Sequence, residues 1–379
     1  MFMGNKRVAI VTWIKYPNFG TFLQAYALQQ VISDLGYDVS ILDDSQILEE
    51  SKKRAKENNI VVRLLFALKF RLAYLLQYIR NERYFKLCRE GLKLYDSFLN
   101  TYLKVDRNTL PLTNLDNRYD IFVCGSDQIW FPSLAIFSPY YYLSFTSKKK
   151  VAYAPSIGLT KYPEAFIPIV KPLLDRFDAL SVREKKGADA LKSFLHREVE
   201  DVLDPTLLLP VDIWSKLLLS CRLFAGEYIF CYFLSYNEDY MQYVREFASQ
   251  KKLPIVVFAL EYRNWDFGDA MMAGGPQEFL TAIRDASFVF TDSFHGTIFS
   301  LHFKKRICVF KRFEDDDSNN QNSRIINLLK LVKLEDFFIG RSDLWKVENL
   351  PSIDYKAVHA AIQQERDKSI TYLRDSLAK

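Results

Sequence analysis

The fold of this chain is decided by the stretch Phe288-Val289-Phe290-Thr291-Asp292-Ser293-Phe294-His295-Gly296-Thr297-Ile298-Phe299-Ser300-Leu301. Its first three residues are aromatic or β-branched and predict a strand, which a polar Thr-Asp-Ser cluster ends. Apolar residues at helical spacing follow at positions 294, 298 and 301, so a helix begins where the strand ends. The stretch therefore predicts a strand-to-helix junction in an open α/β sheet.

His295 falls in the first turn of the predicted helix. In open α/β sheets the ligand crevice lies outside the carboxyl ends of the strands, and a helix N-terminus suits an anionic group such as phosphate. The sequence thus places a titratable imidazole beside a predicted anion site. The alternative interpretation is that the imidazole only caps its helix.

Strands and helices alternate on both sides of this junction. The N-terminal half predicts strands at 7–13, 38–42, 120–124, 151–154 and 179–182, with a helix at 22–32. The C-terminal half predicts strands at 228–234, 254–259, 288–290 and 306–310, with helices at 238–251 and 276–285. A chain of 379 residues exceeds the usual size of one domain. We expect an α/β fold of two Rossmann-like domains that face each other across a cleft.

The expected domain boundaries follow from breaker residues. Asp204-Pro205 and Pro210 close the first half, which predicts an N-terminal α/β domain at 1–210 and a C-terminal α/β domain at 211–350. A last helix within 351–379 is expected to pack back toward the N-terminal domain. The first loop has one glycine, Gly20, where a dinucleotide-binding fingerprint needs three, so that function is rejected.

Polar loops follow several predicted strands of the N-terminal half, and we expect them on the acceptor side of the cleft. Amide, hydroxyl and carboxylate groups match sugar hydroxyls, and an indole offers a flat face to a sugar ring. The candidate acceptor-binding residues are Asn18, Gln24, Ser126, Asp127, Gln128 and Trp130. The alternative is that these loops are ordinary turns and that the indole is a core anchor. The polar run 312–324 is expected to form a loop over the cleft.

Basic character is concentrated in a predicted helical insertion at about 47–105. Positions 48–107 hold fourteen Lys or Arg and seven Asp or Glu, although the whole chain carries only +5. This segment is either a core-packed helical pair with solvated charges or an amphipathic surface for peripheral contact with anionic lipid. Nucleic acid is not expected as a partner, because no groove-reading motif accompanies the charge.

Composition also limits the compartment and the cofactors. The beginning of the chain does not resemble a signal peptide, and no apolar run reaches the length of a membrane span. We therefore expect a cytoplasmic protein, with the inner face of the membrane as a second location through the basic insertion. Five scattered cysteines predict free thiols, and the acidic run 314–317 matches no calcium loop, so no metal is expected.

Taken together and in order, several motifs resemble the polysaccharide pyruvyl transferase family. They are Asn18-Phe19-Gly20 with Leu23-Gln24-Ala25-Tyr26-Ala27-Leu28, Gly125-Ser126-Asp127-Gln128-Ile129-Trp130, Tyr153-Ala154-Pro155-Ser156-Ile157-Gly158, Ser181-Val182-Arg183-Glu184, Asp204-Pro205-Thr206 and Thr291-Asp292-Ser293-Phe294-His295-Gly296. The resemblance covers roughly Val8 to Leu331. It implies a fold similar to the glycosyltransferase B architecture.

The resemblance also implies an activity, namely transfer of a pyruvyl group from phosphoenolpyruvate to a hydroxyl of a bacterial capsule, exopolysaccharide or precursor glycan. His295 matches the family's catalytic histidine and is the expected acid/base. The expected partners are phosphoenolpyruvate, as a co-substrate with no further cofactor, and a glycan acceptor, with a lipid-linked form among the candidates.

One position departs from the family pattern. Many members have an arginine two residues before the histidine, where this chain has Ser293. The expected donor-binding residues are Ser293, Gly296 and Thr297, with Arg183 or Arg324 supplying the cation for the phosphate. Two other functions stay open at this stage: a glycosyltransferase using a nucleotide sugar on the same scaffold, and a non-enzymatic glycan- or membrane-associated scaffold.

Overall fold

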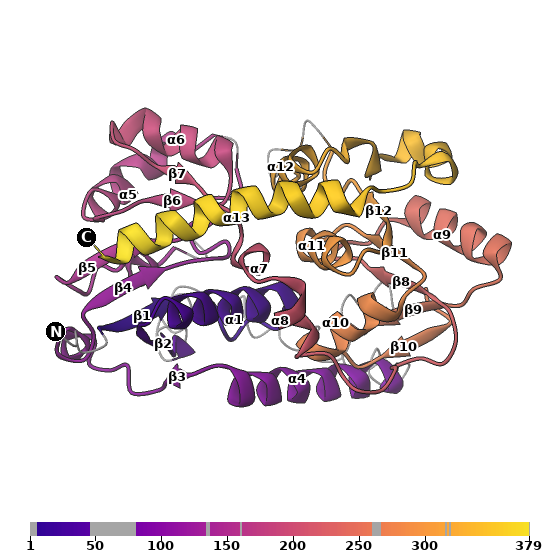
Figure 1. Ribbon diagram of the computed structural model, residues 1–379, viewed down its shortest axis with the longest axis horizontal. Helices are drawn as coiled ribbons and strands as arrows, with labels where there is room; N and C mark the ends of the chain where they lie inside the picture. The colour runs from indigo at the N-terminus through magenta and orange to yellow at the C-terminus, as the bar shows by residue number, and fades with distance from the viewer. Residues whose placement is uncertain are drawn as a thin grey trace, which may run out of the picture.

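The computed structural model describes residues 6–45, 81–133, 137–159, 161–259, 267–314, 317 and 320–378. Two parallel β-sheets, each covered by helices, lie side by side and are joined by long helices that reach across both (Figure 1). The predicted α/β class is confirmed.

The first sheet has five parallel strands in the order β3-β2-β1-β4-β5. Its elements are β1 (Arg7–Val11), α1 (Phe19–Asp34), β2 (Asp38–Leu42), α4 (Glu82–Tyr102), β3 (Val105–Asp106), β4 (Ile121–Cys124) and β5 (Lys149–Ala152). Helix α1 begins earlier than predicted because Asn18 caps it. The Asn18 side chain accepts hydrogen bonds from the backbone amides of Gly20 and Thr21.

A smaller unit follows the first sheet and leads to the second. It comprises α5 (Ile167–Leu174), β6 (Ser181–Val182), α6 (Lys185–Leu195), β7 (Glu200–Asp201), α7 (Pro205–Leu208) and α8 (Val211–Ser215). Strands β6 and β7 pair with each other, and a single bridge from Ala179 to Val151 joins this unit to β5. Short 3₁₀ segments lie at Leu112–Asn117, Pro139–Tyr142, Glu164–Phe166, Glu335–Phe337 and Arg341–Asn349.

The second sheet has six parallel strands in the order β10-β9-β8-β11-β12-β13. Its elements are β8 (Ile229–Tyr232), α9 (Glu238–Lys251), β9 (Ile255–Phe258), β10 (Ala270–Met272), α10 (Pro276–Asp285), β11 (Phe288–Thr291), α11 (Phe294–His302), β12 (Arg306–Phe310), α12 (Ser323–Leu331), β13 (Phe338–Ile339) and α13 (Tyr355–Ala378). Strand β11 is central, because Phe290 pairs with Cys231 on one side and Cys308 on the other.

The junction between β11 and α11 has the predicted strand-to-helix form. Ser293 is the N-cap of α11, and its hydroxyl accepts a hydrogen bond from the backbone amide of Gly296 at 3.3 Å. The Thr297 hydroxyl donates to the Ser293 carbonyl at 2.9 Å. The first of these bonds satisfies a backbone amide that a helix start leaves open, and the two together fix the direction in which His295 leaves the helix.

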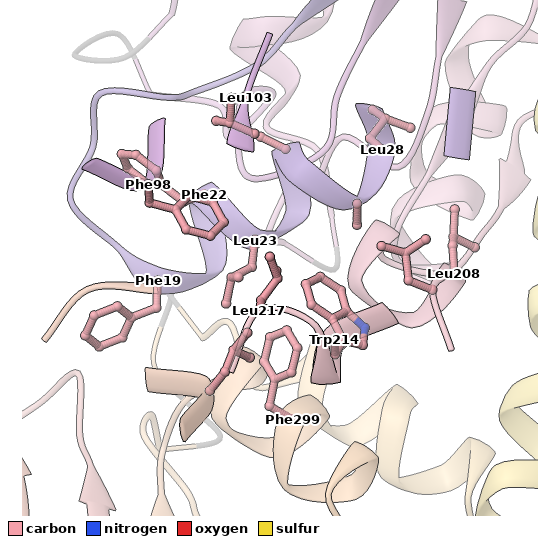
Figure 2. Close-up of a cluster of buried hydrophobic side chains, with 14 of the residues drawn as sticks. Phe19, Phe22, Leu23, Leu28, Phe98, Leu103, Leu208, Trp214, Leu217 and Phe299 are labelled. Carbon is pink, nitrogen blue, oxygen red and sulfur yellow. The ribbon is translucent and has the colours of Figure 1, made fainter. Parts of the chain in front are cut away.

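One apolar core runs through both halves. Phe19 of α1 stacks on Phe279 of α10, with ring centroids 4.6 Å apart, and on Tyr95 of α4 at 5.5 Å. Trp214 of α8 belongs to the same core and lies beside Phe299 and Leu217 in Figure 2; it meets the Phe299 ring edge-on, with centroids 4.9 Å apart. Each such aromatic ring contributes about 1.5–3 kcal/mol through burial, so the contact between the halves is part of the fold.

Two long helices cross the boundary between the halves (Figure 1). Helix α4 contacts both α1 and α10, with Tyr95, Phe98 and Leu99 on its buried face. Helix α13 starts in the second half, where the Tyr355 hydroxyl donates to the Lys305 carbonyl, and reaches the first half, where Lys149 donates to the Leu377 carbonyl.

Part of the basic insertion predicted at 47–105 lies outside the described residues, because its positions 46–80 are not among them. The described part forms α4 and β3. Within the described ranges, no helix combines the length and the hydropathy that crossing a membrane requires.

Candidate active site

A cavity of about 290 Å³ lies between the two halves, at loops that follow the carboxyl ends of strands in both sheets. From the first half it is lined by Trp13, Tyr16, Asn18, Thr21, Asp127 and Gln128. From the second half it is lined by Leu234, Asp292, Ser293, Phe294, His295, Arg312, Phe313, Gln321, Asn322, Arg324 and Ile325. We refer to it as the front cavity.

His295 reaches into the front cavity from the first turn of α11 and is only 7% exposed. Its ring lies against the start of α1 in the other half. A Cβ atom added to Gly20 would stand 1.8 Å from the His295 Nδ1 atom and 2.3 Å from Cε1. Position 20 therefore has to be glycine for steric reasons, since any side chain there would occupy the place of the imidazole.

Asp204 lies behind the imidazole, with its Oδ2 atom 3.6 Å from the His295 Nε2 atom. The same oxygen accepts a hydrogen bond from Arg183 at 2.5 Å, and Oδ1 accepts from the Thr206 amide and hydroxyl at 2.9 and 2.6 Å. Burial alone would raise the pKa of Asp204, but His295 and Arg183 hold that pKa well below its usual range. The carboxylate is thus ionised and can stabilise positive charge on the imidazole.

Two arginines give the front cavity positive charge. Arg324, in the first turn of α12, donates from Nη2 to the Gln321 Oε1 atom at 3.1 Å, while its buried Nε has no hydrogen-bond partner. Burial and the neighbouring Arg183 lower the pKa of Arg324 to about 10. Among the described carboxylates, none lies within ion-pair distance of Arg312 or Arg324, and Asp127 and Asp292 line the same cavity at longer range from them.

The polar loops of the first half also meet the second half at this cavity. The Gln128 side chain donates to Gln321 Oε1 at 2.7 Å, a hydrogen bond that crosses between the halves. Asp127 accepts from the Thr21 hydroxyl at 2.5 Å and from the Gln128 amide at 2.8 Å. Asn18, Asp127 and Gln128 therefore lie where the sequence predicted, and the 312–324 run lines the cavity through its described residues.

Three of the predicted acceptor-binding side chains, those of Gln24, Ser126 and Trp130, are buried and do not line the cavity. The Gln24 amide is fully buried and bridges the Thr12 hydroxyl, at 3.0 Å, and the Ser126 amide, at 3.1 Å. The Ser126 hydroxyl donates to the Ala154 carbonyl. Trp130 stacks on Tyr142 at 5.3 Å and is 1% exposed, so its face is covered by protein. These side chains satisfy buried backbone groups or fill the core, and they position the loop that carries Asp127.

The predicted donor residues divide into two groups. Ser293 and Arg324 line the front cavity together with His295. Gly296 and Thr297 instead support the helix start: a Cβ atom at position 296 would stand 2.4 Å from the Thr291 hydroxyl oxygen. Arg183 lines an adjoining pocket on the other side of the Phe294 ring.

Sequence reasoning did not predict several residues of this site, among them Asp204, Arg312, Trp13 and Tyr16. Asp204 was interpreted as a domain boundary and as part of a family motif, and Arg312 as the start of a polar loop over the cleft, but neither was given a role in the site. Trp13 and Tyr16 frame the cavity from the first loop, with ring centroids 6.4 Å apart, and Tyr16 is 63% exposed. Their position just after the first strand was the available signal, because that is where ligand-binding loops of α/β sheets lie.

Comparison with solved structures shows the fold. A putative UDP-N-acetylglucosamine 2-epimerase from Listeria monocytogenes superposes with a TM-score of 0.53 at 11% identity, covering 96% of this chain and 91% of that one. S. aureus MnaA in complex with UDP gives 0.52 at 11% identity, covering 95% and 91%. At this identity the likeness concerns the fold alone, and it confirms the predicted glycosyltransferase B-like architecture.

Sequence comparison supplies the family. The family model described as "Polysaccharide pyruvyl transferase" matches residues 18–312, most of the chain. No curated protein sequence matches the chain significantly. The matched region contains Asn18, His295 and Arg312 of the front cavity, and Asp204 behind the imidazole.

Proposed function

Because this chain belongs to the polysaccharide pyruvyl transferase family, we propose that it transfers a pyruvyl group from phosphoenolpyruvate to hydroxyls of a bacterial cell-surface glycan or its precursor. The observation that carries the proposal is the pairing of His295 with ionised Asp204 beside two cavity arginines. An acid/base next to cationic groups is what this donor requires.

The reaction needs two proton movements and one departing phosphate. The methylene carbon of phosphoenolpyruvate takes up a proton, which leaves its C2 carbon electrophilic. A sugar hydroxyl adds to C2, the C2–O bond to phosphate breaks, and a second hydroxyl closes the ketal. The two hydroxyls lose two protons in total. One replaces the proton that the methylene carbon took up to become a methyl group, and the other leaves with the phosphate as hydrogen phosphate.

His295 is the proposed acid/base for these steps. It lines the front cavity, and Asp204 stabilises the imidazolium when the ring holds the proton. Gly20 keeps the imidazole in place from the opposite half. A group held from both sides in this way loses little orientation between substrate binding and reaction.

Arg324 and Arg312 are the proposed cations for the donor phosphate and carboxylate. They stand in for the arginine that many family members carry where this chain has Ser293. Both line the same cavity as His295, and an arginine guanidinium binds phosphate or carboxylate through paired hydrogen bonds. Asn18, Asp127 and Gln128 on the facing rim are the proposed contacts to the glycan hydroxyls.

The test measures phosphate release from phosphoenolpyruvate in the presence of candidate glycan acceptors. The wild type should release phosphate only when a suitable acceptor is present. His295→Ala should reduce the rate by about 10²–10⁴-fold, the usual contribution of an acid/base group. His196→Asn is the matched control, because His196 is an exposed residue that ends α6, away from the cavity.

Two results would contradict the proposal. An undiminished rate in His295→Ala would remove the role of the imidazole. Turnover of a UDP-sugar, with no phosphate release from phosphoenolpyruvate under any acceptor, would replace pyruvyl transfer with glycosyl transfer on the same fold.

A further inference from the structure

A second pocket, of about 380 Å³, lies behind the front cavity. Phe294 and Arg324 line both spaces and so form the wall between them. The guanidinium carbons of Arg183 and Arg324 lie 5.0 and 5.9 Å from the centre of the Phe294 ring. The remaining lining comes from α6, β7, α7, α12 and α13, and we refer to this space as the rear pocket.

Several hydrogen-bond donors of the rear pocket are buried without a partner. Arg183 is 8% exposed, and its Nε and Nη2 atoms make no hydrogen bond, although Nε lies 3.9 Å from Glu184 Oε1. The Arg324 Nε atom and the Asn327 Nδ2 atom are also buried without a hydrogen-bond partner. Leaving a buried donor unpaired costs about 1–3 kcal/mol, and more for a charged group. Three such side chains around one pocket indicate a ligand with several acceptor oxygens.

The charges around the rear pocket favour an anion. Its acidic residues are Asp201, Asp204 and Glu365, but Asp204 is paired with Arg183, and Glu365 is paired with Lys368. Four basic residues of the lining, Arg183, Lys185, Arg324 and Lys330, outnumber these three acidic residues, so the lining carries a net charge of +1. Positive charge with unpaired N–H donors matches a phosphate group, which presents several acceptor oxygens and negative charge.

We propose that the rear pocket is a second oxyanion site, and that it receives the inorganic phosphate released in the front cavity. The second part rests on the proposed function. Arg324 borders both spaces, so it can contact phosphate in the front cavity and in the rear pocket. Inorganic phosphate then binds without displacing phosphoenolpyruvate and inhibits turnover in a noncompetitive manner.

The test is titration calorimetry with inorganic phosphate at fixed ionic strength. Asn327→Leu removes one unpaired donor from the rear pocket at nearly constant side-chain size, and it should weaken phosphate binding by about tenfold, the equivalent of one hydrogen bond to a charged group. Its affinity for phosphoenolpyruvate should stay at the wild-type value. Gln250→Leu, an exposed amide of α9, is the matched control and should change neither affinity.

A second pair of variants separates the two spaces. Lys330→Gln alters an exposed residue of the rear pocket, so folding is preserved, and it should weaken phosphate alone. Arg312→Gln alters the front cavity and should weaken phosphoenolpyruvate alone. The proposal is overturned if Asn327→Leu and Lys330→Gln both bind phosphate like the wild type, or if phosphoenolpyruvate displaces phosphate one for one.

These measurements require no turnover, so they stand apart from the proposed reaction. Phosphate binding that depends on Asn327, in a protein that releases no phosphate from phosphoenolpyruvate, would overturn the reaction and leave the oxyanion site. If the protein releases phosphate from phosphoenolpyruvate but both rear-pocket variants bind phosphate like the wild type, the oxyanion site is overturned and the reaction stands.

Discussion

The contact between Gly20 and His295 can be tested by Gly20→Ala in two backgrounds. The added Cβ would stand 1.8 Å from the imidazole Nδ1 atom, whereas ordinary contact between such atoms is about 3.5 Å. The ring or the helix must therefore move by more than about 1 Å. Overpacking of this kind costs about 1–3 kcal/mol, although alanine favours a helix over glycine by up to about 1 kcal/mol.

The measurement is guanidinium denaturation of four proteins: wild type, Gly20→Ala, His295→Ala and the double variant. Gly20→Ala should lower the free energy of unfolding in the wild-type background. In the His295→Ala background the clash is absent, so the same change should be neutral or stabilising. The coupling free energy should be about 1–3 kcal/mol. Equal effects of Gly20→Ala in both backgrounds would refute the contact.

Two further predictions concern pH dependence and the acceptor. Burial lowers the pKa of His302 to about 4 from an ordinary 6.5. The unfolded chain therefore binds more protons than the folded chain between these values, and this residue should remove about 3 kcal/mol of stability as the pH falls through that window. His302→Gln should flatten the stability profile from pH 6.5 to 4, and an unchanged slope would show that His302 is not buried in its neutral form. Tyr16→Ala should raise the KM for the glycan acceptor and leave the melting temperature within about 1 °C of wild type, because the ring is 63% exposed at the cavity mouth. An acceptor KM equal to that of wild type would exclude a sugar contact at Tyr16.

Local patterns were sufficient to predict the central junction. The change from a β-rich run to helical spacing at 288–301 gave β11 and α11 and placed His295 in the first turn. The same loop logic placed Asn18 and Asp127 at the cavity. Periodicity does not say which neighbours a side chain meets, however, and so it could not show that Gln24 and Trp130 face the interior.

The remaining site residues depend on contacts that are distant in sequence. Asp204 becomes the partner of His295 only when α7 is placed beside α11, which involves packing across both halves. Arg312 joins the site because the chain after β12 returns over the cavity. Neither contact can be recognised from the neighbouring sequence. The sequence therefore showed that the arginine is absent at Ser293, but it did not show which single residue replaces it.

The core that passes through Phe19 has a consequence for how the protein is made. Phe19 is synthesised near the start of the chain, but Phe279, on which it stacks, is synthesised only after most of the chain. A nascent chain that ends before α10 therefore leaves the Phe19 side of α1 without this cover. The first half should be a client of chaperones during translation, and a fragment of residues 1–210 should aggregate even though it contains a complete parallel sheet.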